Sequence, residues 1–179
     1  MTCGSALAWR IILEVKSSSS SVPSTRTRTE IYLLDTNRCS LLMEGEAAVQ
    51  EKMRRNKDNL VATCVFVEAE LLYMAHYSQK QAANLTRVQN FLDAISVHSL
   101  DTQAIREYAH LKADVMRHFG PKEKSKRRHF TLSQLGVSDN DLWIAAIALR
   151  HNLTIVSADT DFRRLQEVRP LRVETWLTA

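Results

Sequence analysis

The stretch IYLLDTN, residues 31–37, decides the fold. Its first four residues are apolar and of strand-forming types, and the run stops abruptly at Asp35. Such a short apolar run is typical of a strand buried on both faces, as in parallel sheets that are covered by helices. Ligands of these sheets bind beyond the carboxyl ends of the strands, and Asp35 stands at that end. Asp35 is therefore a candidate site residue, provided that other polar side chains accompany it.

The composition is that of a globular chain that can bury a core. The 179 residues suit one domain, and 45% hydrophobic with 25% charged residues is ordinary for this class. No apolar run is long enough to cross a bilayer, so we expect no membrane segment. Three cysteines without C-x-x-C spacing argue against a disulfide scaffold or a zinc site and favour a reducing, cytoplasmic setting. The glycine-rich motifs that cradle phosphates are absent.

Residues 1–30 differ in composition from the rest of the chain. The Ser/Thr tract at 17–29 contains too little apolar area to offset its ordering entropy, so we expect a flexible extension that is dispensable for chemistry. A signal peptide is disfavoured because the apolar stretch before the tract is short and charged. Translation from a start codon upstream of the natural one is another origin for such a tail. We expect the folded domain to cover residues 31–179.

Beyond residue 30, strand and helix patterns alternate. We expect strands at 31–34, 60–63, 95–97, 153–156 and 171–173. Helices are expected at 38–44, 47–56, 65–78, 79–94, 101–118 and 139–150, with a loop at 119–137. One face of the helix at 101–118 should hold Ile105, Tyr108, Ala109, Leu111 and Val115. The alternation predicts a three-layer α/β/α fold with a central parallel sheet.

Further carboxylates are expected at the same end of this sheet as Asp35. Glu70 lies on the edge of the apolar face of the helix at 65–78, and Asp141 shares a face with Ile144. Asp159 and Asp161 follow the strand at 153–156, and Asp159 is preferred because it is nearer the strand end. Each acid alone has an ordinary explanation, as a helix cap or as a charge at the rim of a helix face. Together they suggest a common site.

A cluster of carboxylates needs a partner of opposite charge. Two like charges about 4 Å apart at an effective dielectric of about 20 repel by roughly 4 kcal/mol. The cluster is stable only if it is protonated or if divalent cations lie among its members. Mg²⁺ and Mn²⁺ prefer oxygen ligands, keep several waters and bind substrate phosphates. The acids therefore predict metal-assisted hydrolysis of phosphodiester bonds.

At this point the chain resembles PIN-domain nucleases, and within them the VapC-type toxins of bacterial toxin–antitoxin pairs. Four motifs in order carry the resemblance, at residues 33–37, 70–73, 140–146 and 154–162, and it runs from about Ile31 to Trp176. It implies an endoribonuclease that needs Mg²⁺ or Mn²⁺, a cognate antitoxin that occludes the site, and a homodimer as the family's expected assembly. Carried over, the catalytic and metal-binding acids are Asp35, Glu70, Asp141 and Asp159, with Asp161 competing for the fourth place and Asn37 and Ser157 as supporting polar groups.

Two features depart from this family. The N-terminal extension has no counterpart, and the loop before Asp141 is longer and more basic than expected. Residues 117–129 contain six Lys or Arg residues and one acid, a net +5 that leaves the rest of the chain at −1. Neutralisation of RNA phosphates and a merely solvated loop both remain open as its role.

The residues support three functional hypotheses. The first is a metal-dependent endoribonuclease acting as a toxin, and a small, nearly bare domain favours it. The second is a PIN-type nuclease of RNA maturation or decay without an antitoxin. The third is a catalytically silent RNA-binding or scaffold domain, against which the complete acid set argues. Tyr73 and Trp143 are expected to pack rather than to stack on bases.

Overall fold

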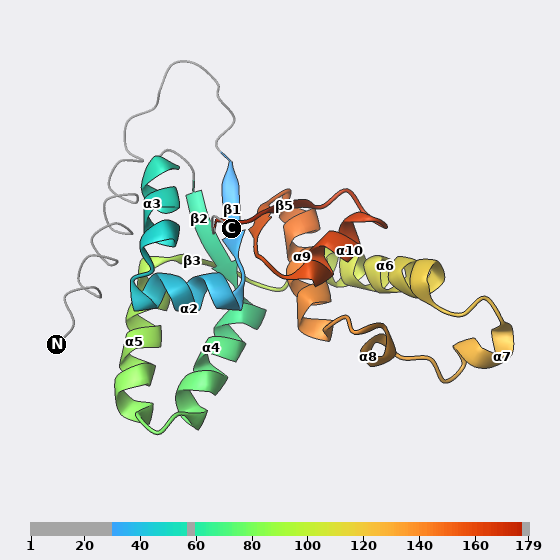
Figure 1. The fold of residues 1–179 in the computed structure, drawn as a ribbon, viewed down its shortest axis with the longest axis horizontal. Helices are drawn as coiled ribbons and strands as arrows, with labels where there is room; N and C mark the ends of the chain where they lie inside the picture. Colours follow the sequence, from blue (N-terminus) through green and yellow to red (C-terminus); the bar gives the residue numbers. More distant parts are fainter. Residues whose placement is uncertain (1–29, 57–59, 177–179) are drawn as a thin grey trace, which may run out of the picture.

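A five-stranded parallel sheet forms the centre of the computed structural model, which describes residues 30–56 and 60–176 (Figure 1). Its order is β3-β2-β1-β4-β5, and every pairing is parallel. The chain runs outward from β1 to β3 and then returns to the other side of β1, so the order reverses between β1 and β4. Open α/β sheets bind ligands at such a reversal. The strands are β1 (Ile31–Leu34), β2 (Leu60–Cys64), β3 (Ser96–His98), β4 (Thr154–Val156) and β5 (Arg172–Glu174).

Helices connect consecutive strands and cover the sheet. Figure 1 shows α2 to α5 grouped to one side of β1 and β2, and α6 to α10 to the other. The predicted three-layer α/β/α fold is thereby confirmed. The helices before β3 are α2 (Thr36–Glu44), α3 (Ala47–Arg55), α4 (Val65–Tyr77) and α5 (Gln81–Ala94). Those after it are α6 (Thr102–Phe119), α7 (Lys124–Arg127), α8 (Leu132–Leu135), α9 (Asp139–His151) and α10 (Thr160–Gln166).

Strand β1 is buried on both faces, as its apolar run predicts. Tyr32, Leu33 and Leu34 are 4%, 0% and 0% exposed. Trp176, which is also buried, packs its ring edge-on against Tyr32 with 5.1 Å between centroids. Glu30 is joined to the sheet as well, because its carbonyl accepts a hydrogen bond of 3.0 Å from the Leu60 N–H. The rest of the predicted extension, residues 1–29, lies outside the described residues.

Two local expectations are wrong. The segment 119–137 is not all loop, because it contains α7 and α8. Helix α8 begins with a reciprocal cap in which the Gln134 side chain accepts from the Thr131 N–H at 2.9 Å, and such a cap stabilises even a short helix. In α6, Ile105 is 46% exposed and Ala109 is also exposed. The buried stripe is narrower than expected and consists of Ala104, Leu111 and Val115.

Neither a membrane-spanning helix nor a disulfide is found in the part of the chain that the structure describes. No helix there is both long enough and apolar enough to cross a bilayer. Cys39 and Cys64 are free, buried thiols, and Cys3 lies outside the described residues.

Candidate active site

Asp35 joins the end of β1 to the start of α2. Its backbone is extended, and its carboxylate accepts a hydrogen bond of 2.7 Å from the Arg38 N–H, which makes it the N-cap of α2. The residue is only 5% exposed. Burial raises the pKa of Asp35, whereas hydrogen bonds from Ser157 and from the Arg38 backbone act in the opposite direction. The cap explains why an acid can end a buried strand.

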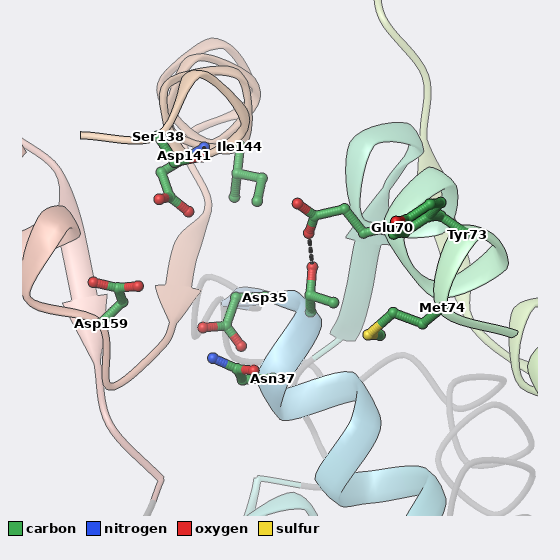
Figure 2. Close-up of a pocket in the computed structure, with 10 residues that line it drawn as sticks. Asp35, Asn37, Glu70, Tyr73, Met74, Ser138, Asp141, Ile144 and Asp159 are labelled. Carbon is green, nitrogen blue, oxygen red and sulfur yellow. Dashed lines mark hydrogen bonds between the residues drawn. The ribbon is translucent and has the colours of Figure 1, made fainter. Parts of the chain in front are cut away.

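Glu70 projects from α4 and is held from two sides. One carboxylate oxygen accepts a hydrogen bond from the Thr36 hydroxyl and the other accepts one from the Asn140 side-chain amide. Figure 2 shows the contact between Glu70 and the Thr36 hydroxyl as a dashed line. These bonds connect α4 to α2 and α9 through a single side chain. Sequence reasoning did not single out Thr36 or Asn140 as site residues; the only signal is that each adjoins a predicted acid, Asp35 or Asp141.

Asp141 lies in the first turn of α9. Ser138 caps this helix, since its hydroxyl accepts from the N–H groups of Asn140 at 3.1 Å and Asp141 at 3.4 Å. Burial raises the pKa of Asp141 to about 7, and further contributions come from the negative charges of Asp159, Asp161, Glu70 and Asp35. The carboxylates predicted from the sequence therefore lie within electrostatic reach of one another.

The carboxylates of Asp159 and Asp161 lie in different surroundings. Asp159 lines the same hollow as Asp35 and caps α10 by accepting from the Asp161 N–H at 2.9 Å. Its own N–H donates to the Ser157 hydroxyl at 2.9 Å. The carboxylate of Asp161 does not line this hollow, and it lies 3.8 Å from the Arg164 guanidinium.

The hollow at the carboxyl end of the sheet has a volume of about 390 Å³. Figure 2 shows Asp159 and Asp141 on one side of it, Glu70 on the other and Asp35 between them. We call it the acidic pocket; its lining is Asp35, Thr36, Asn37, Glu70, Tyr73, Met74, Ser138, Asp141, Ile144 and Asp159.

The two aromatic side chains expected to pack have different environments. Trp143 does pack, because it stacks on Tyr108 at 3.6 Å and on Phe66 at 5.0 Å between centroids. Tyr73 does not: it is 67% exposed at the rim of the acidic pocket and stacks on the exposed Tyr77 one helical turn away. The buried face of α4 consists of Val67, Leu71 and Ala75, and Tyr73 lies on the opposite side of the helix.

A buried cation lies beside the acidic pocket. Arg38 is 2% exposed, and its charge lowers the pKa of Asp35 against the effect of burial. Its Nε and Nη2 atoms have no hydrogen-bond partner among the described residues. Nothing in the local sequence signals this burial, since an arginine in the first turn of a helix normally extends into solvent.

The acidic pocket suits a hydrated divalent cation. No three His, Cys, Asp or Glu side chains of the described ranges are close enough to hold an ion by themselves. Mg²⁺ does not require such a cage, because it keeps several waters and binds through one or two carboxylates. The donors that line the pocket are hard oxygen ligands, and no Lys or Arg lies among them. Burial, and after it repulsion by the neighbouring carboxylates, raises the pKa of Asp141, and a bound cation would offset both effects.

Comparison with known proteins identifies the family. The PIN domain family model matches residues 32–168, so the chain belongs to the PIN-domain family. Its relatives within that family are VapC ribonucleases. Ribonuclease VapC2 of Rickettsia felis is 25% identical over 82% of this chain and 98% of the relative. The tRNA(fMet)-specific endonuclease VapC of Salmonella typhimurium is 24% identical over 81% of this chain and 97% of the relative.

Solved structures agree with this assignment. VapBC2 from Rickettsia felis, bound to a promoter DNA fragment, contains a chain that is 25% identical, with a TM-score of 0.64 over 82% of this chain and 98% of that one. DNA-bound VapBC from Salmonella typhimurium, at 24% identity, shares the fold with a TM-score of 0.67 over 83% of this chain and 100% of that one. The predicted resemblance to VapC-type ribonucleases is therefore confirmed.

Proposed function

We propose that this chain is the toxin of a type II toxin–antitoxin pair, an endoribonuclease that hydrolyses RNA phosphodiester bonds with Mg²⁺ or Mn²⁺. The observation that carries the proposal is the acidic pocket, in which carboxylates from four parts of the chain surround one hollow of about 390 Å³. The VapC ribonucleases that match nearly their whole length to this chain support it.

The side chains of the acidic pocket take distinct roles in this proposal. A divalent cation bound there supplies the charge that acidifies an attacking water and stabilises the leaving oxygen. Asp35, Glu70, Asp141 and Asp159 are the acids that would hold it, one or two of them directly and the others through its waters. Asp35 is fixed by its cap, and Glu70 by two neutral donors, so neither has to reorganise. Asp141, whose pKa is about 7 without a metal, would be kept ionised by the bound cation.

Asp159 is the preferred fourth acid. Its position in the lining of the acidic pocket supports this choice, and the ion pair of Asp161 with Arg164 argues against the alternative. Asn37, also in the lining, and Ser157, which bonds to Asp35, support the acids in this scheme.

The comparisons also suggest partners. The related structures are complexes of toxin with antitoxin, and we propose that a cognate antitoxin covers the acidic pocket here. A homodimer is the assembly we expect. The name of the Salmonella relative makes a tRNA the first substrate to test. Free buried thiols and an RNA substrate suit a cytoplasmic site of action.

The test is cleavage of a tRNA transcript and of unstructured RNA, with Mg²⁺ or Mn²⁺ and with EDTA. We expect metal-dependent cleavage that falls at least about 100-fold in Asp35→Asn and in Glu70→Gln, because each removes a ligand charge. Asparagine can still cap α2, so Asp35→Asn should keep the fold.

Glu68→Gln is the matched control, since Glu68 lies on the same helix but does not line the acidic pocket. It should cleave as the wild type does. Cleavage that survives both EDTA and Asp35→Asn would refute the proposed mechanism.

A further inference from the structure

The segment 122–128, between α6 and α8, is here called the basic arm. It holds five Lys or Arg residues against Glu123, a net charge of +4 and thus as large as that of the whole chain. Helix α7 within it has no buried residue. Figure 1 shows the arm at the end of the molecule farthest from α3 and well away from the sheet. Packing of the core does not require these charges.

The shape of the basic arm is set by hydrogen bonds to backbone carbonyls within it and just before it. The Arg127 guanidinium donates to the carbonyls of Pro121 at 2.9 Å and Lys122 at 2.6 Å. Lys126 pairs with Glu123 at 2.9 Å. The side chains of Lys124 and Arg128 have no hydrogen-bond or ion-pair partner in the described part of the chain. The side chains of Lys124 and Arg128 thus remain available on a turn that other side chains of the arm hold in place.

One hollow lies at the basic arm, and a second is lined by the segment that leads from the arm to the acidic pocket. The first, of about 550 Å³, is lined by Lys124, Ser125, Arg127 and Arg128. The second, of about 410 Å³, begins at Phe130, two residues beyond the arm, and extends to Ser138. Ser138 also lines the acidic pocket. The second hollow therefore adjoins the acidic pocket, and Figure 1 shows α8, whose residues line it, between α7 and α9.

We propose that the basic arm binds the phosphate backbone of the RNA outside the cleaved bond, chiefly through Lys124 and Arg128. This inference rests on the proposed function and identifies the part of the substrate that the acidic pocket does not hold. The lining of that pocket contains four carboxylates and no Lys or Arg, so it does not attract a polyanion by itself.

The arm binds RNA through direct contacts with phosphates rather than through long-range electrostatic attraction. At physiological salt the Debye length is about 8 Å, so exposed charges farther apart are largely screened. Lys124 and Arg128 are four residues apart and share one helical face, with Cβ atoms about 6 Å apart. Two cations at that separation can contact neighbouring phosphates of one strand. An RNA supplies a phosphate at every nucleotide, whereas an acidic protein segment supplies its charges irregularly.

Binding of RNA to a protein that cannot cut it tests the proposal. All proteins carry Asp35→Asn, and the probes are a tRNA transcript and a short fragment that spans only the cleaved bond. The arm variant is Lys124→Gln/Arg128→Gln. The control is Lys52→Gln/Arg54→Gln on α3, which makes the same change of charge at the other end of the molecule (Figure 1). Thermal unfolding verifies that each protein remains folded.

We expect the arm variant to bind the tRNA about 25-fold more weakly at about 0.1 M salt, because each lost phosphate contact removes about 5-fold. The slope of log Kd against log salt should decrease in magnitude by about 1.4, which corresponds to two contacts with a single strand. The arm variant should bind the short fragment as tightly as the parent protein does. The control protein should bind the tRNA with the parent affinity. In the wild-type background, KM for tRNA should rise while kcat is retained.

Each other outcome is decisive. An unchanged Kd and salt slope in the arm variant would overturn the proposal. An equal loss of RNA affinity in the arm and control variants would overturn it as well, because net charge alone would then explain the loss. Weakened antitoxin binding with unaltered RNA binding would make the arm a protein-docking surface instead. If the arm variant binds RNA weakly as expected but the wild type cleaves no RNA with metal, the proposed function fails and the arm assignment stands.

Discussion

At Glu70, two neutral side chains from different helices hold one carboxylate. Thr36 and Asn140 occupy both of its oxygens, and hydrogen bonds to an ionised acceptor are stronger than those between neutral groups. They offset part of the cost of placing a partly buried charge among other carboxylates. They also fix the direction in which Glu70 points, which matters for the cation ligand that we propose it to be.

We expect Asn140→Ala and Thr36→Val each to lower RNA cleavage by about 10- to 100-fold, as is typical when a partner of a metal ligand is lost. The Mg²⁺ concentration that gives half-maximal rate should rise, since Glu70 is then free to turn away. In the double variant, the loss of transition-state free energy should be smaller than the sum of the losses in the two single variants, because both side chains act on one carboxylate.

Mg²⁺ titrations of the cleavage rate measure this effect. Asn90→Ala, an exposed asparagine on α5, is the control and should behave as the wild type does. A normal Mg²⁺ dependence in Asn140→Ala would show that the contact with Glu70 does not orient the ligand.

At the scale of an element, the end of α6 determines where the basic arm begins. The Gly120 N–H donates to the Met116 carbonyl at 3.1 Å and closes the helix. A Cβ atom at position 120 would lie 2.3 Å from that carbonyl oxygen, which is a backbone atom and moves only with the helix end. Glycine is therefore required here by close approach.

Gly120→Ala should destabilise the protein by about 1–3 kcal/mol through this overpacking. For a chain of this size the melting temperature falls by about 2–4 °C per kcal/mol, so a decrease of about 5 °C is expected in thermal unfolding. RNA affinity should fall as well, because the arm is displaced. Ser125→Ala, on α7, serves as the control and should not change the melting temperature. A Gly120→Ala protein with wild-type stability would contradict the steric argument.

At the scale of the whole molecule, the sheet topology gathers charges that the sequence keeps far apart. The reversal between β1 and β4 places Asp35 and Asp159 side by side, and α4 and α9 bring Glu70 and Asp141 to the same edge. The pKa of Asp141, about 7 in the fold and 3.8 in an unperturbed chain, is a property of this assembly. Burial is the main cause and the other carboxylates add to it.

The stability of the metal-free protein should therefore depend on pH. The folded state binds the Asp141 proton more tightly than the unfolded state does, so unfolding releases it. The resulting destabilisation is absent below about pH 4, grows as pH rises, and is complete above about pH 7. Three pKa units correspond to about 4 kcal/mol, which solvent screening of this partly exposed group reduces to about 2 kcal/mol.

Asp141→Asn should thus raise the melting temperature in EDTA at pH 8 by about 5 °C and flatten its dependence on pH. Addition of Mg²⁺ should reduce or reverse this advantage, because the wild type gains a bound cation. Thermal unfolding from pH 5 to pH 8, with EDTA and with Mg²⁺, measures both effects. An Asp141→Asn protein that is no more stable than the wild type at pH 8 in EDTA would show that neither burial nor the neighbouring carboxylates disfavour the ionised Asp141.

The sequence by itself determined the strands, most helices and the identity of the acids. Continuous apolar runs such as 31–34 specify buried strands because burial on both faces leaves no place for a polar residue. Asp35 was found because it ends an apolar run and Asp141 because it shares a helix face with Ile144, and local periodicity is all that such an inference requires. The capped helix α8 was missed because a four-residue helix has too little periodicity to detect.

Only the tertiary structure decided which groups meet. The partners of Glu70 lie 34 and 70 residues away in sequence, and nothing local connects them. The same holds for Arg38, buried beside Asp35, for Tyr73, left exposed at the pocket rim, and for Asp159, which reaches the hollow that Asp161 does not line. The physical reason is that burial of a helix position depends on the element that faces it, and that element is supplied by the order of the strands rather than by neighbouring residues.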